Sequence, residues 1–256
     1  MTSYLGKHAE LYDHFYANKN YFQEAQQIHN WLQKYSSHPV YNLIEIACGT
    51  GNHALKLAKY NYEIFATDYS TDMINMAKKK LTPELKNVKF SVQDMRSLPE
   101  PNLPFDAAIC LFDSIGYAQT NEAIHQVFQG INKSLRRGGL FIFEFWHAAA
   151  MIKYHDAVRI KNLKMDNYTI QRISETSIDF ATQICTIKYT INEFNRDTKK
   201  YSKIEEIQKN RFFLLEEMKL FIDANNFEFI MAFDGYNTKK TIDDTTWHIL
   251  VVCKKC

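Results

Sequence analysis

Glycine, proline and cysteine are all scarce in this chain. Its 256 residues include only 8 glycines, 5 prolines and 5 cysteines. Disordered and fibrous chains are rich in glycine and proline, so the composition excludes both classes. The cysteine count is odd, and most of the cysteines stand in apolar runs, which favours reduced thiols over disulfides. Cys253 and Cys256 have the spacing of a metal-binding pair, but there is no second pair, so we expect no metal site.

The chain also lacks an excess of charge and a long hydrophobic run. Lys plus Arg number 31 and Asp plus Glu number 29, a balance that argues against nucleic acid as a partner. The most apolar stretch, residues 139–152, is interrupted by Glu144 and His147 and is too short to span a membrane. The first residues have no apolar signal region. We therefore expect a cytoplasmic protein without a membrane partner, either a monomer or a homodimer.

Short apolar runs alternate with helical patterns over the first 150 residues. The helical stripe from Ala123 to Leu135 is expected to stop at Gly138-Gly139, and Ser70 or Thr71 is expected to cap another helix. Alternating strands and helices predict an α/β fold with a mainly parallel sheet. The runs that we interpret as strands are residues 43–47, 63–67, 88–92, 106–112 and 139–145.

The pattern changes after about residue 150. Residues 157–213 show β-alternation, as in Ile187, Tyr189 and Ile191, and contain no clear helix. A helix over 214–225 and strands over 227–233 and 246–252 follow. We interpret residues 151–211 as an antiparallel β insertion at one edge of a core made of residues 1–150 and 212–256. An insertion at that edge would lie over the ligand crevice of the sheet.

The most informative segment is a strand that runs into the turn Gly49-Thr-Gly51 and then into a helix. Glycine allows a tight turn and a close approach of the backbone to a ligand. The segment fits the pattern GxGxxA, and Asp68 follows about 20 residues later, where an acid can accept the hydroxyls of a ribose. At this level the chain could be an NAD-dependent oxidoreductase or another nucleotide-binding enzyme.

Five motifs in order resemble class I S-adenosylmethionine-dependent methyltransferases over residues 40–146. They are Glu45-x-x-Cys48-Gly49-x-Gly51, Asp68-x-Ser-x-x-Met73, Gln93-Asp94-Met95, Phe105-Asp106 and Leu135-x-x-Gly138-Gly139. The resemblance implies a Rossmann-like seven-stranded, mostly parallel sheet with helices on both faces, an antiparallel β insertion after the fifth strand, and S-adenosylmethionine as cofactor. It also implies the cofactor-binding residues: Tyr21, Glu45, Ala47, Cys48, Gly49, Gly51, Asp68, Tyr69, Met73, Asp94, Met95, Leu111 and Phe112.

Within that family the chain is similar to the sugar-amine and glycine/sarcosine N-methyltransferases. The likeness implies an N-terminal helical lid that carries pocket tyrosines, among them Tyr12, and an inserted sheet that forms a roof over the substrate. It also implies that Arg211 binds an acidic part of the acceptor. Tyr117 and Trp146 would supply an aromatic wall for a cation.

Methyl transfer needs alignment and exclusion of water more than it needs acid–base chemistry. An amine acceptor only has to be neutral, whereas a hydroxyl acceptor needs a base. Asp113, Glu144 and His147 stand at predicted strand ends, and His147 is our candidate catalytic base. We expect N-methylation of a small molecule, with O-methylation through His147 as the alternative. An oxidoreductase, a nucleic-acid methyltransferase and a non-catalytic binding module are less favoured, and no motif identifies the acceptor.

Overall fold

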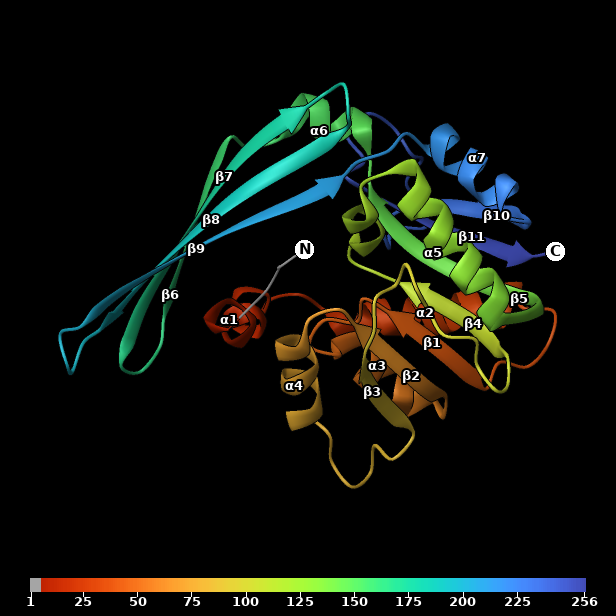
Figure 1. Ribbon diagram of the computed structural model, residues 1–256, viewed down its shortest axis with the longest axis horizontal. Helices are drawn as coiled ribbons and strands as arrows, with labels where there is room; N and C mark the ends of the chain where they lie inside the picture. The colour runs from red at the N-terminus through yellow and green to blue at the C-terminus, as the bar shows by residue number, and fades with distance from the viewer. Residues whose placement is uncertain (1–5) are drawn as a thin grey trace.

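A seven-stranded sheet forms the larger part of the computed structural model, which describes residues 6–256 (Figure 1). Its strand order is β10-β11-β5-β4-β1-β2-β3. The first five strands in the chain pair in parallel, whereas β11 runs antiparallel to both of its neighbours. The strands are β1 (Asn42–Ile46), β2 (Glu63–Asp68), β3 (Val88–Val92), β4 (Phe105–Cys110), β5 (Leu135–Trp146), β10 (Phe227–Asp234) and β11 (His248–Lys255). This sheet confirms the Rossmann-like expectation.

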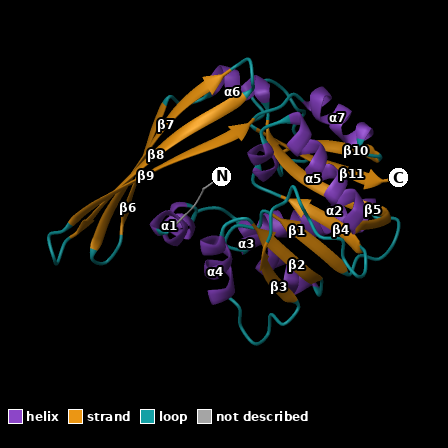
Figure 2. Ribbon diagram, in the orientation of Figure 1, coloured by secondary structure: helices purple, strands orange, loops and turns teal. Residues whose placement is uncertain are grey.

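Helices cover both faces of this sheet (Figure 2). Apolar residues of α2 and α3 belong to the core on one face, and those of α5 and α7 belong to the core on the other. Neighbouring strand residues such as Leu43 and Ile44 point to opposite cores, as the two-residue period of a strand requires. The helices are α1 (Lys7–Phe15), α2 (Tyr21–Tyr35), α3 (Asn52–Leu57), α4 (Thr71–Lys79), α5 (Asn121–Ser134), α6 (Ala148–Tyr154) and α7 (Leu215–Ala224). None of the described helices is long and apolar enough to cross a membrane.

Polar caps set the start of several helices. The side chain of Ser70 accepts a hydrogen bond from the Met73 amide and so caps α4, as the sequence predicts. The predicted end of α5 is wrong: the helix ends at Ser134, and Gly138 and Gly139 lie inside β5. Gly138 has a φ of +75°, and the β4–β5 register shifts beside this segment, so the glycines allow an irregular strand start instead of ending the helix.

A second sheet of four antiparallel strands, in the order β6-β7-β8-β9, follows α6. It confirms the predicted antiparallel insertion after β5. In Figure 1 its long, twisted strands extend away from the first sheet, and α1 lies beneath them next to α4. The chain returns through the bridge between His147 and Phe213 to α7. The strands are β6 (Val158–Lys164), β7 (Tyr168–Asp179), β8 (Ile184–Asn195) and β9 (Tyr201–Arg211).

Candidate active site

A pocket opens at the carboxyl ends of β1, β2 and β4. Strand order reverses between β1 and β4, and open α/β sheets bind ligands at such a point. The pocket therefore lies where topology alone would place a ligand. Its lining contains Tyr12, Tyr21, Glu45, Ala47, Cys48, Gly49, Thr50, Asn52, His53, Asp68, Tyr69, Ser70, Met73, Gln93, Asp94, Met95, Arg96, Leu111, Phe112, Ser114 and Tyr117.

The glycine turn forms one wall of this pocket. Gly49 and Gly51 have φ angles of +55° and +74°, a region that suits glycine. A Cβ at Gly51 would lie 2.5 Å from the ring of Phe90, so this glycine lets the loop pack on the core. The Gly49 and Ser70 amides each donate a 2.8 Å hydrogen bond to the Asp68 carboxylate. The strand end and the loop are thereby fixed around one acid, whose pKa burial raises.

Glu45 is the one lining carboxyl that is both almost fully buried and only partly hydrogen-bonded. It is 2% exposed, and its Oε2 atom has no hydrogen-bond partner among the described residues. Burial raises the pKa of this carboxyl to about 8, and the neighbouring charge of Asp68 adds to the rise. An unsatisfied acid in a ligand pocket fits the ammonium group of an amino-acid moiety, such as that of S-adenosylmethionine.

The loop after β3 contributes a different kind of acid. Arg96 donates from Nε and Nη2 to the carboxylate of Asp94, and this ion pair lowers the Asp94 pKa. Asp94 therefore stays ionised and keeps acceptor capacity toward the pocket. Tyr69 lies at the pocket rim and is 54% exposed, so its ring is accessible to a planar group.

The first helix is tied to the glycine loop. Asp13 in α1 accepts hydrogen bonds from Thr50 (2.7 Å) and Asn52 (2.9 Å) and forms an ion pair with Lys80 (2.5 Å). These contacts bring Tyr12 into the pocket, where the rings of Tyr12 and Tyr16 lie 4.7 Å apart. The N-terminal segment thus closes one side of the cavity.

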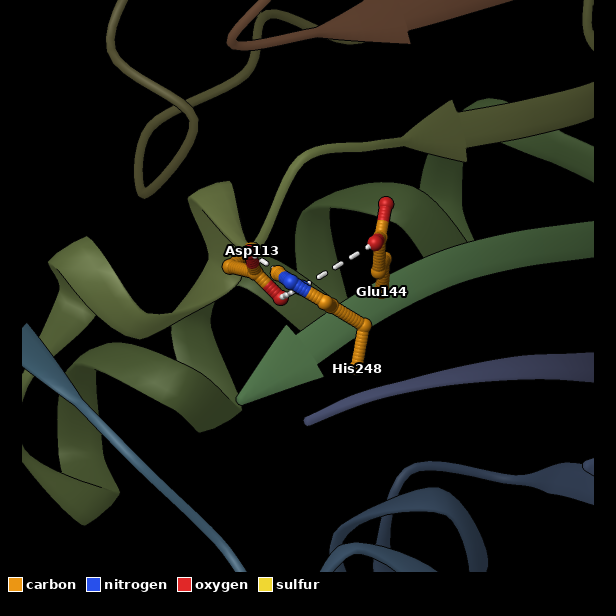
Figure 3. Close-up of side chains that lie close together, drawn as sticks. All are labelled: Asp113, Glu144 and His248. Carbon is orange, nitrogen blue, oxygen red and sulfur yellow. Dashed lines mark hydrogen bonds and ion pairs between the residues drawn. The ribbon is translucent and has the colours of Figure 1, made fainter. Parts of the chain in front are cut away.

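Three ionisable side chains, those of Asp113, Glu144 and His248, lie close together (Figure 3). The Nδ1 atom of His248 lies 2.8 Å from Asp113 Oδ2 and 3.4 Å from Glu144 Oε1. Glu144 also accepts a 2.9 Å hydrogen bond from the amide of Phe112, a pocket residue. We call Asp113, Glu144 and His248 the acidic triad. Its ligand atoms lie within 4.8 Å of one another, close enough to surround a cation.

The charges of the acidic triad follow from its burial. Burial and the charge of Asp113 raise the pKa of Glu144 to about 7. Burial alone would lower the pKa of His248, but the charges of Asp113 and Glu144 outweigh it and raise that pKa to about 9. The triad therefore has two carboxyl groups and a single imidazole, an excess of acidic groups next to the pocket.

Most of the sequence-predicted site residues lie in the pocket, but four do not. Gly51 supports the loop from behind and does not line the cavity. His147 is 7% exposed, and its Nδ1 contacts the carbonyl of Thr246 at 3.2 Å. Trp146 packs in the apolar cluster between α6 and the second sheet. Arg211 is paired with Glu217 at 2.6 Å and donates to Asn121. The side chains of His147, Trp146 and Arg211 are thus engaged in contacts outside the pocket.

The sequence reasoning missed His248 and Lys19. His248 begins β11 and reaches the site only because that strand pairs with β5. Lys19 lies 4.5 Å from the centre of the Phe112 ring and is paired with Glu24. No motif marks either residue, because both reach the site through long-range contacts.

Comparison with known proteins decides between the nucleotide-binding alternatives. Residues 43–139 match a family model described as a methyltransferase domain. With similar proteins and solved structures that are named as methyltransferases, this match identifies the chain as an S-adenosylmethionine-dependent methyltransferase. It is 25% identical over 203 residues to a dTDP-3-amino-3,4,6-trideoxy-alpha-D-glucopyranose N,N-dimethyltransferase of Streptomyces venezuelae, covering 78% of this chain and 82% of the relative.

Two further proteins are similar to this methyltransferase over most of its length. A dTDP-4-amino-2,3,4,6-tetradeoxy-D-glucose N,N-dimethyltransferase of Saccharopolyspora spinosa is 25% identical over 193 residues, with 74% of each chain covered. The crystal structure of an S-adenosylmethionine-dependent methyltransferase from Clostridium acetobutylicum ATCC 824 superposes with a TM-score of 0.79. It shares 22% identity and covers 97% of this chain and 98% of the other.

Proposed function

We propose that this methyltransferase transfers a methyl group to the amine of a small-molecule acceptor. The observation that carries the proposal is the acidic triad, whose excess of acidic groups lies directly behind Phe112 at the end of β4. A negative field stabilises the positive charge that develops on the acceptor nitrogen as the neutral amine takes the methyl group. The two amino-sugar N,N-dimethyltransferases to which the chain is similar support the same acceptor class.

The pocket residues fit the cofactor group by group. Asp68 is placed to accept from the ribose hydroxyls, and Asp94 and Met95 border the space for the adenine. Glu45, with its unsatisfied oxygen, and the backbone at Ala47–Gly49 suit the amino-acid end. Cys48, Tyr69, Met73 and Tyr21 complete the walls, and Leu111 and Phe112 mark the end nearest the acceptor. The bound cofactor supplies an electrophilic methyl group.

The protein's own contribution is to align the acceptor and keep water out. Tyr12, Phe112 and Tyr117 form an aromatic wall at the acceptor end of the pocket, and aromatic faces favour cationic groups. Positioning of this kind accounts for much of the acceleration of a bimolecular displacement. Glu144, whose pKa burial and the charge of Asp113 raise to about 7, does not line the pocket, so we assign it no direct proton transfer from the amine.

O-methylation is the weaker alternative. It needs a base at the acceptor, and the candidate proposed from the sequence, His147, does not line the pocket. A single assay separates the two reactions: turnover of a small amine compared with that of the matched hydroxyl compound, in which oxygen replaces the acceptor nitrogen. N-methylation predicts product only from the amine.

Cofactor binding is tested by calorimetry with S-adenosylhomocysteine. We expect Asp68→Ala to weaken binding at least tenfold, or about 1.4 kcal/mol, because charge-assisted hydrogen bonds to the ribose are lost. Asp197→Ala removes an exposed aspartate of the β8–β9 hairpin and serves as the matched control. Equal affinity in the two variants would remove Asp68 from the site, and failure of the native chain to bind would refute the placement of the cofactor.

A further inference from the structure

Arg172 in β7 is a buried cation for which residues 6–256 provide no counter-ion. Arg172 is only 4% exposed, and neither its Nε nor its Nη1 atom has a hydrogen-bond partner among the described residues. The guanidinium instead lies against aromatic rings, 4.3 Å from the centre of Phe15 and 5.1 Å from that of Tyr189. Burying an unpaired charge costs several kcal/mol. A protein that keeps such a group has a use for its charge.

A second cation stands directly beside it. Lys161 in β6 is the register partner of Arg172, and both side chains lie over the ring of Tyr16, at 5.3 Å and 5.6 Å from its centre. Burial lowers the pKa of Lys161, and the charge of Arg172 lowers it further. Like charges opposite each other destabilise a sheet. We call Lys161 and Arg172 the cationic pair.

Two acids on this face of the sheet contact α1 and form no ion pair with the cationic pair. Glu193 is paired with Lys7 at 3.1 Å, and Glu206 lies 3.0 Å from His8. Both partners belong to α1, so the contacts that dock this helix on the sheet use these two carboxylates. Within residues 6–256, neither Lys161 nor Arg172 forms an ion pair. The described residues therefore leave the positive charge of the pair without a counter-ion.

The cationic pair does not line the pocket, but Tyr16 connects it to Phe112 at the acceptor end. Tyr16, which both cations contact, meets Phe112 edge to face with ring centres 5.1 Å apart. Phe112 lines the pocket and is held by Glu144 of the acidic triad. A small acceptor in front of Phe112 is therefore one aromatic ring away from Arg172.

We propose that Arg172, assisted by Lys161, binds an anionic group of the methyl acceptor, a phosphate or a carboxylate. The inference rests on the proposed function, since it concerns the acceptor of that same site. Guanidinium groups bind both anions in a bidentate manner, and two adjacent cations suit a doubly charged group best. The acceptor class is then an amine that also carries an anion. Arg211, the arginine favoured by the sequence, is paired with Glu217 and has no such freedom.

The first test is the stability of the ligand-free chain. If Arg172 is kept for a ligand, Arg172→Met removes an unpaired buried charge and should raise the melting temperature by roughly 2–4 °C. If its ring contacts are structural, the same change should lower the melting temperature. Arg159→Met, at an exposed ion pair of the neighbouring strand, is the control and should change little.

The second test is binding of inorganic phosphate and of acetate, each at constant ionic strength. We expect phosphate to raise the melting temperature of the native chain and of Arg159→Met, and to bind Arg172→Met at least tenfold more weakly. A larger effect of phosphate than of acetate assigns a phosphorylated acceptor, and the reverse assigns a carboxylate. Equal protection of all three proteins, or no protection by either anion, would overturn the proposal.

Arg172→Lys covers the case in which Arg172→Met does not fold. This variant keeps a cation at position 172 but loses the planar guanidinium that binds an anion through two parallel hydrogen bonds. Its affinity for phosphate should therefore fall about tenfold, and unchanged affinity would count against the proposal. Calorimetry with S-adenosylhomocysteine on the same proteins separates the two proposals. Anion binding without cofactor binding refutes the proposed function alone, whereas normal cofactor binding without anion binding refutes only the role of Arg172.

Discussion

Replacing Glu45 with glutamine should change stability and cofactor binding in opposite directions. Glu45 is 2% exposed, and burial raises its pKa from the ordinary 4.5 to about 8. A raised pKa in the folded state contributes stability that is complete below pH 4.5 and is lost as the pH rises through 8. At 1.36 kcal/mol per pH unit, the loss across this window is at most about 5 kcal/mol. Glutamine does not titrate, so Glu45→Gln escapes the loss.

Urea unfolding at pH 5, 7 and 9 measures this effect. The advantage of Glu45→Gln over the native chain should grow by several kcal/mol from pH 5 to pH 9, while its affinity for S-adenosylhomocysteine at pH 8 should fall at least tenfold. The native chain should also bind that compound more tightly as the pH rises from 6 to 8, because binding selects the carboxylate. Glu63→Gln removes an exposed carboxyl at the start of β2 and is the control. Parallel stability curves for the native chain and Glu45→Gln would refute the reasoning.

Two further substitutions test the surroundings of the site. His248→Gln should destabilise the chain by about 1–2 kcal/mol at pH 7, a modest value because the imidazole is half-buried. The difference in unfolding free energy between the variant and the native chain should disappear as the pH rises through 9, because His248, with its raised pKa, then loses its charge. A difference that persists at pH 10 in urea unfolding would contradict the ion pair. Arg211→Met should cost about 1–3 kcal/mol, since it removes the ion pair with Glu217 but leaves that carboxylate its hydrogen bonds from Gln183 and the Leu214 amide. Affinity for S-adenosylhomocysteine should stay within twofold, and a large loss of affinity in calorimetry would return Arg211 to the binding site.

Sequence reasoning succeeds here where the signal is local. The ranges expected for the strands at 63–67 and 88–92 agree with β2 and β3 to within a residue. It fails at the end of β4, where a strand was expected to continue to Phe112. Phe112 and Asp113 instead have φ angles of +57° and +58°, which turn the chain so that the Phe112 amide meets Glu144. Tertiary contacts decide that turn, and no local preference predicts it.

The same division holds in the site. The glycine loop and Asp68 lie within about 20 residues of one another, so a motif can show them together. The acidic triad joins residues of β5 and β11 with one that follows β4, and a sequence does not give the order of strands in a sheet. Arg172 and Arg211 stand in the same β-rich block with similar neighbours. Both guanidinium groups lie over aromatic rings, and only the structure shows that Arg211 is also paired with Glu217, whereas Arg172 has no ion pair among the described residues.

Opposite charges on the two sides of Phe112 have a consequence for how an acceptor binds. The acidic triad lies behind the Phe112 amide, and the cationic pair lies beyond the ring of Tyr16. Consider an acceptor with an amine at one end and an anion at the other. The acidic triad and the cationic pair both favour the orientation in which the amine faces the triad and the anion faces the pair, whereas the reversed orientation brings like charges together at both ends. The favoured orientation presents the amine to the end of the pocket formed by Leu111 and Phe112. The orientation of the acceptor therefore depends on charges contributed by both sheets. Loss of the acidic triad or of the cationic pair should impair alignment of the amine more than binding of the cofactor.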